Sequence, residues 1–293
     1  PCRYAWHASP QAELQNLLGG QAVILSDCGL WGTANVESEI APLRFRLDAD
    51  EQRHLRQAGI IAAESLATVA RRITPGLSEQ QASALVCREV IERGAFPAVC
   101  LVGADERLRR YRHPIPTDNA IARSVLLVIG ARWRGLIACC SRVVHFGPID
   151  TDLRRRHEAV CRVDGTLILG TRPGRAVGEL LAAALATYAE AGFGAARQLH
   201  HQGGATGFET REYLAMPGDV RTVLEDQAFA WNPTITGTKS PAGRVSAAVL
   251  FRDDAVMGPF EEFRGLGGVE VPLHGVLHER GRRAHPPVVQ VHE

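Results

Sequence analysis

Residues 75–94 read Pro75-Gly-Leu-Ser-Glu-Gln-Gln-Ala-Ser-Ala-Leu-Val-Cys-Arg-Glu-Val-Ile-Glu-Arg-Gly94. This stretch is a Pro-Gly break, a Ser-x-x-Gln helix start and a helical pattern that ends at glycine. Residues 173–192 repeat the arrangement, and in both units the first and last glycines are 18 residues apart. Because Pro-Gly begins many unrelated helices, two independent helices are the alternative. We interpret the recurrence as a duplicated α/β half.

Further elements extend outward from these two units. Asp48-Ala-Asp-Glu51 is a capping-box start for a preceding helix of about twenty residues, and residues 150–169 form the matching helix before the second unit. Strand-like segments follow at 98–102, 125–130, 136–146, 228–232, 234–237 and 244–251. Helical layers over mixed antiparallel strands predict an α+β fold.

The composition excludes several classes of protein. The 293 residues are 45% hydrophobic and 22% charged, as in globular proteins, and no apolar run is long enough to cross a bilayer. A net charge of +1 gives no overall attraction to nucleic acid or anionic lipid. Seven irregularly spaced cysteines without a C-x-x-C pair argue against a disulfide framework or a structural zinc site. We expect a cytoplasmic protein that binds neither nucleic acid nor a membrane.

Four short motifs, in this order and spacing, carry a family resemblance. The chain resembles the pita-bread metallopeptidases, which include methionine aminopeptidase, Xaa-Pro aminopeptidase and prolidase, and their metal-free relative creatinase. The resemblance covers roughly residues 45–260 and implies a pita-bread fold with pseudo-twofold halves, assembled as a homodimer. The motifs are Arg112-His-Pro-Ile-Pro-Thr117, Gly135-Leu-Ile-Ala-Cys-Cys-Ser-Arg142, Gly203-Gly-Ala-Thr-Gly207 with Arg211-Glu212, and Phe229-Ala-Trp-Asn-Pro233.

The resemblance also divides the chain. Residues 1–44 contain one short apolar segment, 21–26, which reads as a buried strand, and regular patterns begin only at Asp48. We predict that residues 1–44 are the remnant of an N-terminal creatinase-type domain. Residues 45–293 then form the pita-bread, catalytic-like domain.

The metal ligands of the family are replaced here. Its peptidases bind two metal ions with two Asp, one His and two Glu. Transferred one at a time, these positions fall on Val128 or close to it, Cys139, Gly204, Asn232, and either Ser246 or Pro241.

A shift of register does not restore the metal site. No Asp or Glu occurs in residues 119–149 or 227–252. These windows offer only Cys139, Cys140 and His145, with Asn232 as a neutral oxygen, whereas such metals need anionic oxygen, thiolate or imidazole ligands. We therefore predict no metal and no other cofactor.

Candidate catalytic residues remain. His113 matches a family histidine that faces the substrate and is the general acid/base of creatinase; the alternative is a loop histidine that bonds the backbone. Cys139 and Cys140 point to opposite faces of a strand, and one of them faces the pocket. As a nucleophile, Cys139 requires a base or positive charge, such as His113 or Arg142; the alternative is an apolar filler.

The second half contributes His200, His201 and Glu212. One histidine of the pair binds substrate or moves a proton, or else one packs and the other is solvated. Glu212, beside Arg211, matches a family Glu that follows a pocket histidine. The two either bind a zwitterion or carboxylate, or form a surface charge pair.

Two more residues lie in the former metal region. Asn232 offers both a donor and an acceptor to a substrate. Lys239, the only lysine, places a positive charge for an anionic substrate or is simply solvated.

The sequence leads to one preferred function and two alternatives. The preferred function is a metal-independent hydrolase or lyase acting by acid/base chemistry on a small amino-acid-like or amidino compound. His113, Cys139 and His201 are its catalytic candidates. Its substrate-binding candidates are Arg142, His200, Glu212, Asn232 and Lys239. The alternatives are a catalytically inactive pseudo-peptidase that binds a partner and, more weakly supported, a metallopeptidase with displaced ligands.

Overall fold

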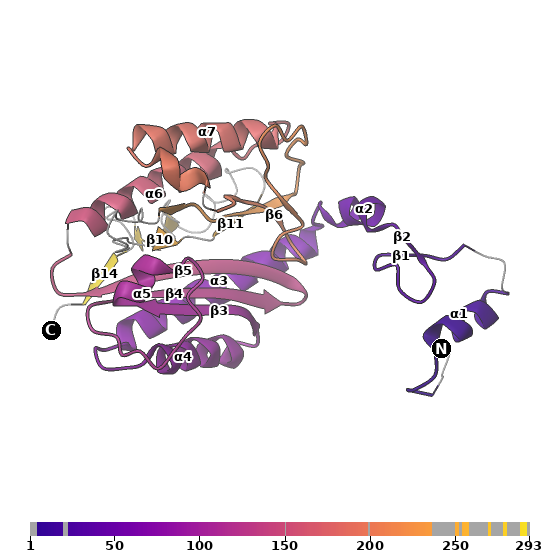
Figure 1. The fold of residues 1–293 in the computed structure, drawn as a ribbon, viewed down its shortest axis with the longest axis horizontal. Helices are drawn as coiled ribbons and strands as arrows, with labels where there is room; N and C mark the ends of the chain where they lie inside the picture. Colours follow the sequence, from indigo (N-terminus) through magenta and orange to yellow (C-terminus); the bar gives the residue numbers. More distant parts are fainter. Residues whose placement is uncertain are drawn as a thin grey trace, which may run out of the picture. The chain divides into compact units, whose positions relative to one another are not determined.

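The computed structural model in Figure 1 describes residues 5–19, 23–149, 151–198 and 200–235, together with short strands further along the chain. The chain divides into two compact units, Pro1–Phe45 and Arg46–Glu293. The origin of the first unit as a domain remnant stays a prediction. Within the described ranges, no helix has the length and apolar character needed to span a membrane.

The first unit is built from short elements with exposed apolar side chains. The predicted buried strand at 21–26 is wrong in burial, because the described strand is Leu25–Ser26 and Leu25 is 59% exposed. Among the described residues of this unit, no helical residue is buried, so no helix covers this strand. The elements are α1 (Pro10–Leu17), β1 (Leu25–Ser26), β2 (Ala34–Asn35), α2 (Glu37–Ile40) and η1 (Ala41–Arg44).

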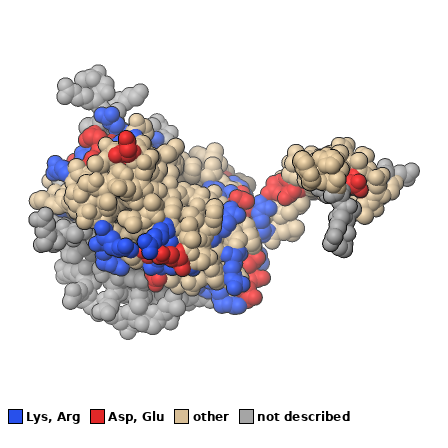
Figure 2. Space-filling model, turned by 90° about the horizontal axis from the view of Figure 1, so that it is seen from below, with Lys and Arg blue, Asp and Glu red and all other residues tan. Residues whose placement is uncertain are grey.

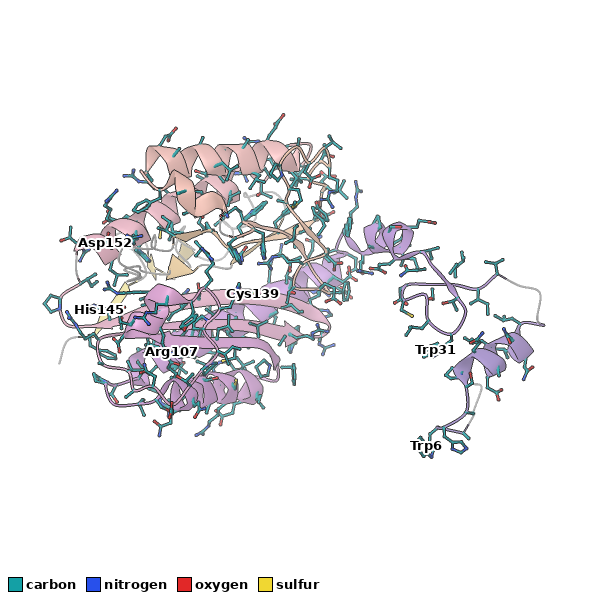
Figure 3. All side chains as sticks on the ribbon, viewed as in Figure 1. Trp6, Trp31, Arg107, Cys139, His145 and Asp152 are labelled. Carbon is teal, nitrogen blue, oxygen red and sulfur yellow. The ribbon has the colours of Figure 1, made fainter. Side chains whose placement is uncertain are left out.

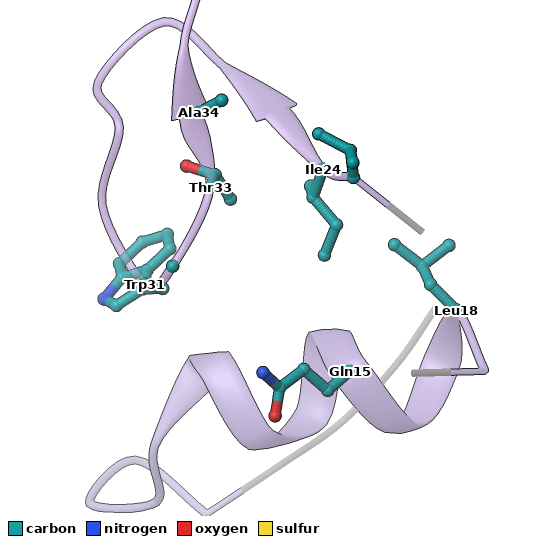
Figure 4. A pocket seen from close by; sticks show the side chains of 8 residues that line it. Gln15, Leu18, Ile24, Trp31, Thr33 and Ala34 are labelled. Atoms are coloured by element: carbon teal, nitrogen blue, oxygen red, sulfur yellow. The ribbon is translucent and has the colours of Figure 1, made fainter. Parts of the chain in front are cut away.

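A cavity of about 410 Å³ lies within this first unit (Figure 4). No predicted site residue lines it. The lining residues are Gln15, Leu18, Val23, Ile24, Trp31, Gly32, Thr33 and Ala34.

Two capped helices open the second unit. α3 (Ala49–Arg72) begins at Asp48, whose carboxylate accepts hydrogen bonds from the amides of Asp50 and Glu51, both at 2.8 Å. α4 (Glu79–Glu92) begins at Ser78, whose hydroxyl accepts from the Gln81 amide at 3.1 Å. Both capping boxes confirm the predicted helix starts.

An antiparallel sheet follows these helices. β3 (Phe96–Ala104), β4 (Ser124–Trp133) and β5 (Leu136–Phe146) pair in that order, with α5 (Asp105–Arg110) between β3 and β4. β14 (Val288–Val291) pairs in parallel with β5. The three predicted strands are confirmed, and each reaches at least its predicted length. Alternate side chains of β4 and β5 pack in one core with α3 and α4.

The second half repeats this order. α6 (Thr151–Gly170) and α7 (Val177–Glu190) precede a sheet of order β11-β8-β6-β7. The predicted segments 234–237 and 244–251 are described only at 234–235 and 250–251. The remaining elements are η2 (Gly194–Gln198), β6 (Gly203–Thr206), β7 (Tyr213–Leu214), β8 (Ala228–Trp231), β9 (Thr234–Ile235), β10 (Leu250–Phe251), β11 (Asp254–Met257), β12 (Val269–Glu270) and β13 (His278–Glu279).

The backbone hydrogen bonds confirm the duplication. The Gly76 amide donates to the Ile121 carbonyl at 2.8 Å, and the Gly174 amide donates to the Val223 carbonyl at 2.8 Å. Gly76 and Gly174 both have a positive φ, 94° and 84°, which glycine adopts readily. The glycines that end α4 and α7 also match, with φ of 80° and 79°.

Figure 1 shows how the halves of the second unit are arranged. The α6–α7 pair lies on one outer side and α4 on the other, with the strands of both halves between them. β11 contacts both β8 and β5 and so connects the two sheets. The result is the α+β arrangement that the sequence predicts. Figure 2 shows basic and acidic side chains interspersed on the described surface, in line with the small net charge.

Candidate active site

The loop that carries His113 is fixed by buried and partly buried carboxylates. Glu79, fully buried at the start of α4, accepts from a β3 amide at 2.8 Å and from Arg107 Nε at 3.0 Å. It also accepts from the Thr117 amide at 2.9 Å and hydroxyl at 2.8 Å. Asp105 accepts from three successive amides that lead into β4, at 2.8–2.9 Å. Arg107, which binds Glu79, is labelled in Figure 3.

The residue after His113 holds this loop against β3. The Val102 amide donates to the Pro114 carbonyl at 3.1 Å. A Cβ on Gly103 would lie 2.5 Å from the Pro114 ring, so only glycine fits beneath it. Pro114 is buried while the His113 side chain remains exposed. The loop thus has a fixed backbone and a solvent-accessible imidazole.

His200 and His201 lie directly before β6, where a buried hydroxyl organises the chain. Tyr188 Oη donates to Gln202 Oε1 at 2.7 Å and accepts from the Thr234 amide at 2.8 Å. Gln202 Nε2 donates to the His200 carbonyl at 2.7 Å. His201 Nδ1 accepts from the Gly203 amide at 3.2 Å, so the proton of the neutral ring is on Nε2.

The three histidines come together from these two loops. The ring centroids of His113 and His200 are 5.1 Å apart, and those of His200 and His201 are stacked at 4.1 Å. Burial, followed by the neighbouring imidazoles of His201 and His113, lowers the pKa of His200 to about 3. Burial, followed by Arg211 and His113, lowers the pKa of His201 to about 4. Both rings are therefore neutral at pH 7 and available as hydrogen-bonding groups.

The side chains of Cys139 and Arg142 lie on opposite faces of β5. Cys140 belongs to the core with α3 and α4, and Arg142 Nη1 lies 3.0 Å from its sulfur. Cys139 (labelled in Figure 3) lies opposite Gly130 on the other face, where a Cβ on that glycine would meet its Sγ at 3.3 Å. The charge of Arg142 therefore acts beside Cys140, and the geometry does not support Arg142 as the activator of Cys139.

Glu212 closes the turn between β6 and β7. Its Oε1 accepts from the amides of Phe208 at 3.1 Å and Glu209 at 3.2 Å. The neighbouring Arg211 donates to the Thr210 carbonyl and acts electrostatically on His201. Arg211 thus helps to lower the pKa of His201, whereas Glu212 stabilises the turn.

Asn232 follows β8 next to the histidine segment. Its amide donates to the Gln202 carbonyl at 3.1 Å, and its carbonyl accepts from Thr234 Oγ1 at 3.2 Å. The residue is 1% exposed, and among the described residues its Oδ1 meets no hydrogen-bond donor. Lys239 lies outside the described residues.

Sequence reasoning missed Asp164, Arg112 and Tyr188. Asp164 is fully buried on α6 and raises the pKa of Tyr188, after the larger effect of burial, while Arg112 acts in the opposite direction. The sequence held a signal for Asp164, since it stands within a stripe of apolar residues at helical spacing. The stripe comprises Val160, Val163 and Leu167.

The described residues do not fit a two-metal site at the transferred positions. Val128 is in the core, and Asn232 offers a neutral oxygen. A Cβ on Gly204 would lie 2.0 Å from the Tyr213 carbonyl oxygen, and one on Gly203 would lie 2.2 Å from a β8 carbonyl oxygen. No histidine fits at either glycine without moving the backbone. Over the described ranges, no three His, Cys, Asp or Glu residues gather in a metal-binding group. Ser246 and Pro241 lie outside those ranges.

Three comparisons place the chain among known proteins. It is 27% identical over 195 residues to a protein named agropine synthesis cyclase from Rhizobium rhizogenes, covering 58% of this chain and 48% of that one. The chain thus spans about half the length of this curated relative.

Solved structures share the fold. A dipeptidase from Pyrococcus horikoshii OT3 matches with a TM-score of 0.78 and 18% identity, covering 99% of this chain and 81% of that one. An X-Pro aminopeptidase from Thermotoga maritima MSB8 matches with a TM-score of 0.72 and 18% identity, covering 87% and 76%. The sequence profile of metallopeptidase family M24 matches residues 53–269. The chain therefore belongs to metallopeptidase family M24 and has its pita-bread fold.

Proposed function

We propose that this chain is a metal-independent enzyme that transforms a small amino-acid-like compound by acid/base chemistry. The observation that carries the proposal is the cluster of His113, His200 and His201. On these fixed backbone segments, the exposed imidazole of His113 can transfer protons while the two neutral imidazoles hydrogen-bond the substrate. The lack of a fitting ligand set at the transferred metal positions supports chemistry of this kind.

The histidines have different positions and therefore different roles. His113 is exposed on its fixed loop and exchanges the proton with the substrate. His200 and His201 are partly buried and neutral, and His201 Nε2 carries the ring proton because Nδ1 accepts from the Gly203 amide. They orient the substrate through hydrogen bonds, and their lowered pKa values leave both proton transfers to His113. Cys139 and Glu212 are not needed in this scheme, and Arg142 lies on the far face of the sheet from Cys139.

The relative from Rhizobium rhizogenes suggests the type of reaction. Its name describes a cyclase, that is, an enzyme that closes a ring. Ring closure takes a proton from the attacking group and gives one to the leaving group, and the reverse reaction opens the ring with water. Both directions are hydrolase or lyase chemistry that histidines can support without a metal ion.

A pseudo-peptidase that only binds a ligand is the second candidate. Val128, buried in the core, and the two glycines that exclude a side chain favour this reading. It predicts ligand binding without turnover, whereas the enzyme proposal predicts both.

The test is a turnover screen on the whole chain. Linear amino-acid conjugates and their cyclic forms are incubated with metal-free protein in the presence of a chelator, and gain or loss of one water is followed by mass spectrometry. Turnover that survives the chelator supports the proposal. Turnover that appears only after metal is added contradicts it, and binding without turnover favours the second candidate.

A further inference from the structure

The acceptor oxygen of Asn232 is buried beside a hydrogen-bonded network. Tyr188 Oη, Gln202 Oε1 and Gln202 Nε2 are all hydrogen-bonded within the network described above. The backbone of Asn232 is also satisfied, through Gln202 and Thr234. Its Oδ1, with less than 1 Å² of exposed area, has no donor among the described residues.

A buried acceptor without a donor costs free energy that folding alone does not recover. An apolar side chain of the same shape avoids that cost, so the polar group destabilises the ligand-free protein. Such groups occur where a ligand supplies the missing hydrogen bond. Asn232 is suited to this, because its amide and the Gln202 side chain both bond to the segment that carries His200 and His201.

The charges around the cluster favour a neutral donor. Residues 119–149 and 227–252 contain no carboxylate. Asp164 and Arg112 act on Tyr188 with opposite signs, and Arg211 adds positive charge beside His201. Among the charges that act on these side chains, the two cations Arg112 and Arg211 outnumber the one carboxylate, Asp164, which disfavours an ammonium or amidinium group.

We propose that Asn232 Oδ1 accepts a hydrogen bond from a neutral amide N–H or hydroxyl group of the substrate, next to the histidine cluster. This narrows the substrate class of the proposed function, on which the inference rests. The amino-acid-like substrate thus presents an uncharged donor at this position, and an amidino group does not occupy it.

The experiment compares small probes by NMR titration of the full chain. Acetamide supplies neutral N–H donors, 1,2-ethanediol supplies hydroxyls, acetamidine is the cationic isostere of acetamide, and N,N-dimethylacetamide has no N–H. We expect one of the two neutral donors to bind with a dissociation constant of about millimolar order. The cation and the dimethyl amide should bind at least about tenfold more weakly, and which neutral donor binds identifies amide or hydroxyl.

Two variants separate binding from folding. Asn232→Leu keeps the shape and removes the acceptor, so it should raise the unfolding temperature by a few degrees and abolish probe binding. Asn119→Leu, in an exposed loop, is the matched control and should leave probe binding unchanged.

Three results would overturn the inference. They are a lower unfolding temperature for Asn232→Leu, tighter binding of acetamidine than of either neutral probe, and no binding of either neutral probe to the wild type. His113→Ala should still bind the neutral probe. Failure of the catalytic proposal therefore shows as absent turnover with intact binding, which is distinguishable from failure at Asn232.

Discussion

The imidazole of His200 stacks on the imidazole of His201, with ring centroids 4.1 Å apart. Two adjacent rings that are both partly buried cannot easily become charged together, because each proton repels the other and loses hydration. Burial is the larger cause for both rings, and together with the charge of Arg211 beside His201 it keeps them neutral at pH 7. It also makes protonation of the folded chain unfavourable, with a consequence for stability.

Stability should fall as the pH is lowered from about 6.5 to about 3. The pKa of His200 is lowered from 6.5 to about 3 and that of His201 from 6.5 to about 4, so the unfolded chain binds protons that the folded chain refuses. Replacing His200 by Phe keeps a stacked ring and removes one of these groups. Urea unfolding at pH 7 and pH 5 should show a smaller loss for His200→Phe than for the wild type. An equal loss in both would contradict the assignment.

His113→Ala should remove turnover while leaving the fold intact. His113 is exposed on a loop fixed by Glu79 and Asp105, so its side chain adds little to stability. Loss of a general acid/base typically costs about 10²–10⁴-fold in rate. The matched control is His54→Ala, since His54 packs edge-on against Trp133 on a different element. A rate for His113→Ala equal to that of the control would end the catalytic role of this histidine.

Glu79→Gln should destabilise the chain and loosen the His113 loop. The buried carboxylate accepts from Arg107 Nε, a β3 amide and Thr117, and removing its charge leaves these donors poorly matched. Breaking a buried pair costs about 3–5 kcal/mol. Glu92→Gln, which breaks only the exposed pair with Arg88, should stay within about 0.5 kcal/mol. Denaturant unfolding measures both, and equal effects would show that Glu79 does not anchor the loop.

Gly204→Ala should cost about 3 kcal/mol or more, because its Cβ would lie 2.0 Å from the Tyr213 carbonyl oxygen. Gly59→Ala is the control: its Cβ would meet only Ala138, at 4.0 Å, in the middle of α3. That change should stabilise by about 0.5–1 kcal/mol, since alanine is the better helix former. Thermal unfolding compares them. A tolerated alanine at 204 would mean that a side chain fits at this family position.

The sequence predicted the local structure well where chemistry and periodicity agreed. The capping residues Asp48 and Ser78 gave correct helix starts, and the repeated Pro-Gly breaks gave the duplication. The prediction that segment 21–26 is buried was wrong, because an apolar segment is buried only where other elements pack over it. The site was harder to predict, since His113 and His200 are joined only by tertiary contact. Asp164 was overlooked as one acidic residue in an ordinary helical pattern.

We propose that this member of family M24 works through its histidines and binds no pair of metal ions. Metal content by elemental mass spectrometry tests it most directly. The protein is measured as purified and again after soaking in manganese, cobalt, zinc and iron followed by desalting. We expect less than about a tenth of an equivalent of any metal throughout. One or two tightly held equivalents would contradict it and would restore the metallopeptidase reading.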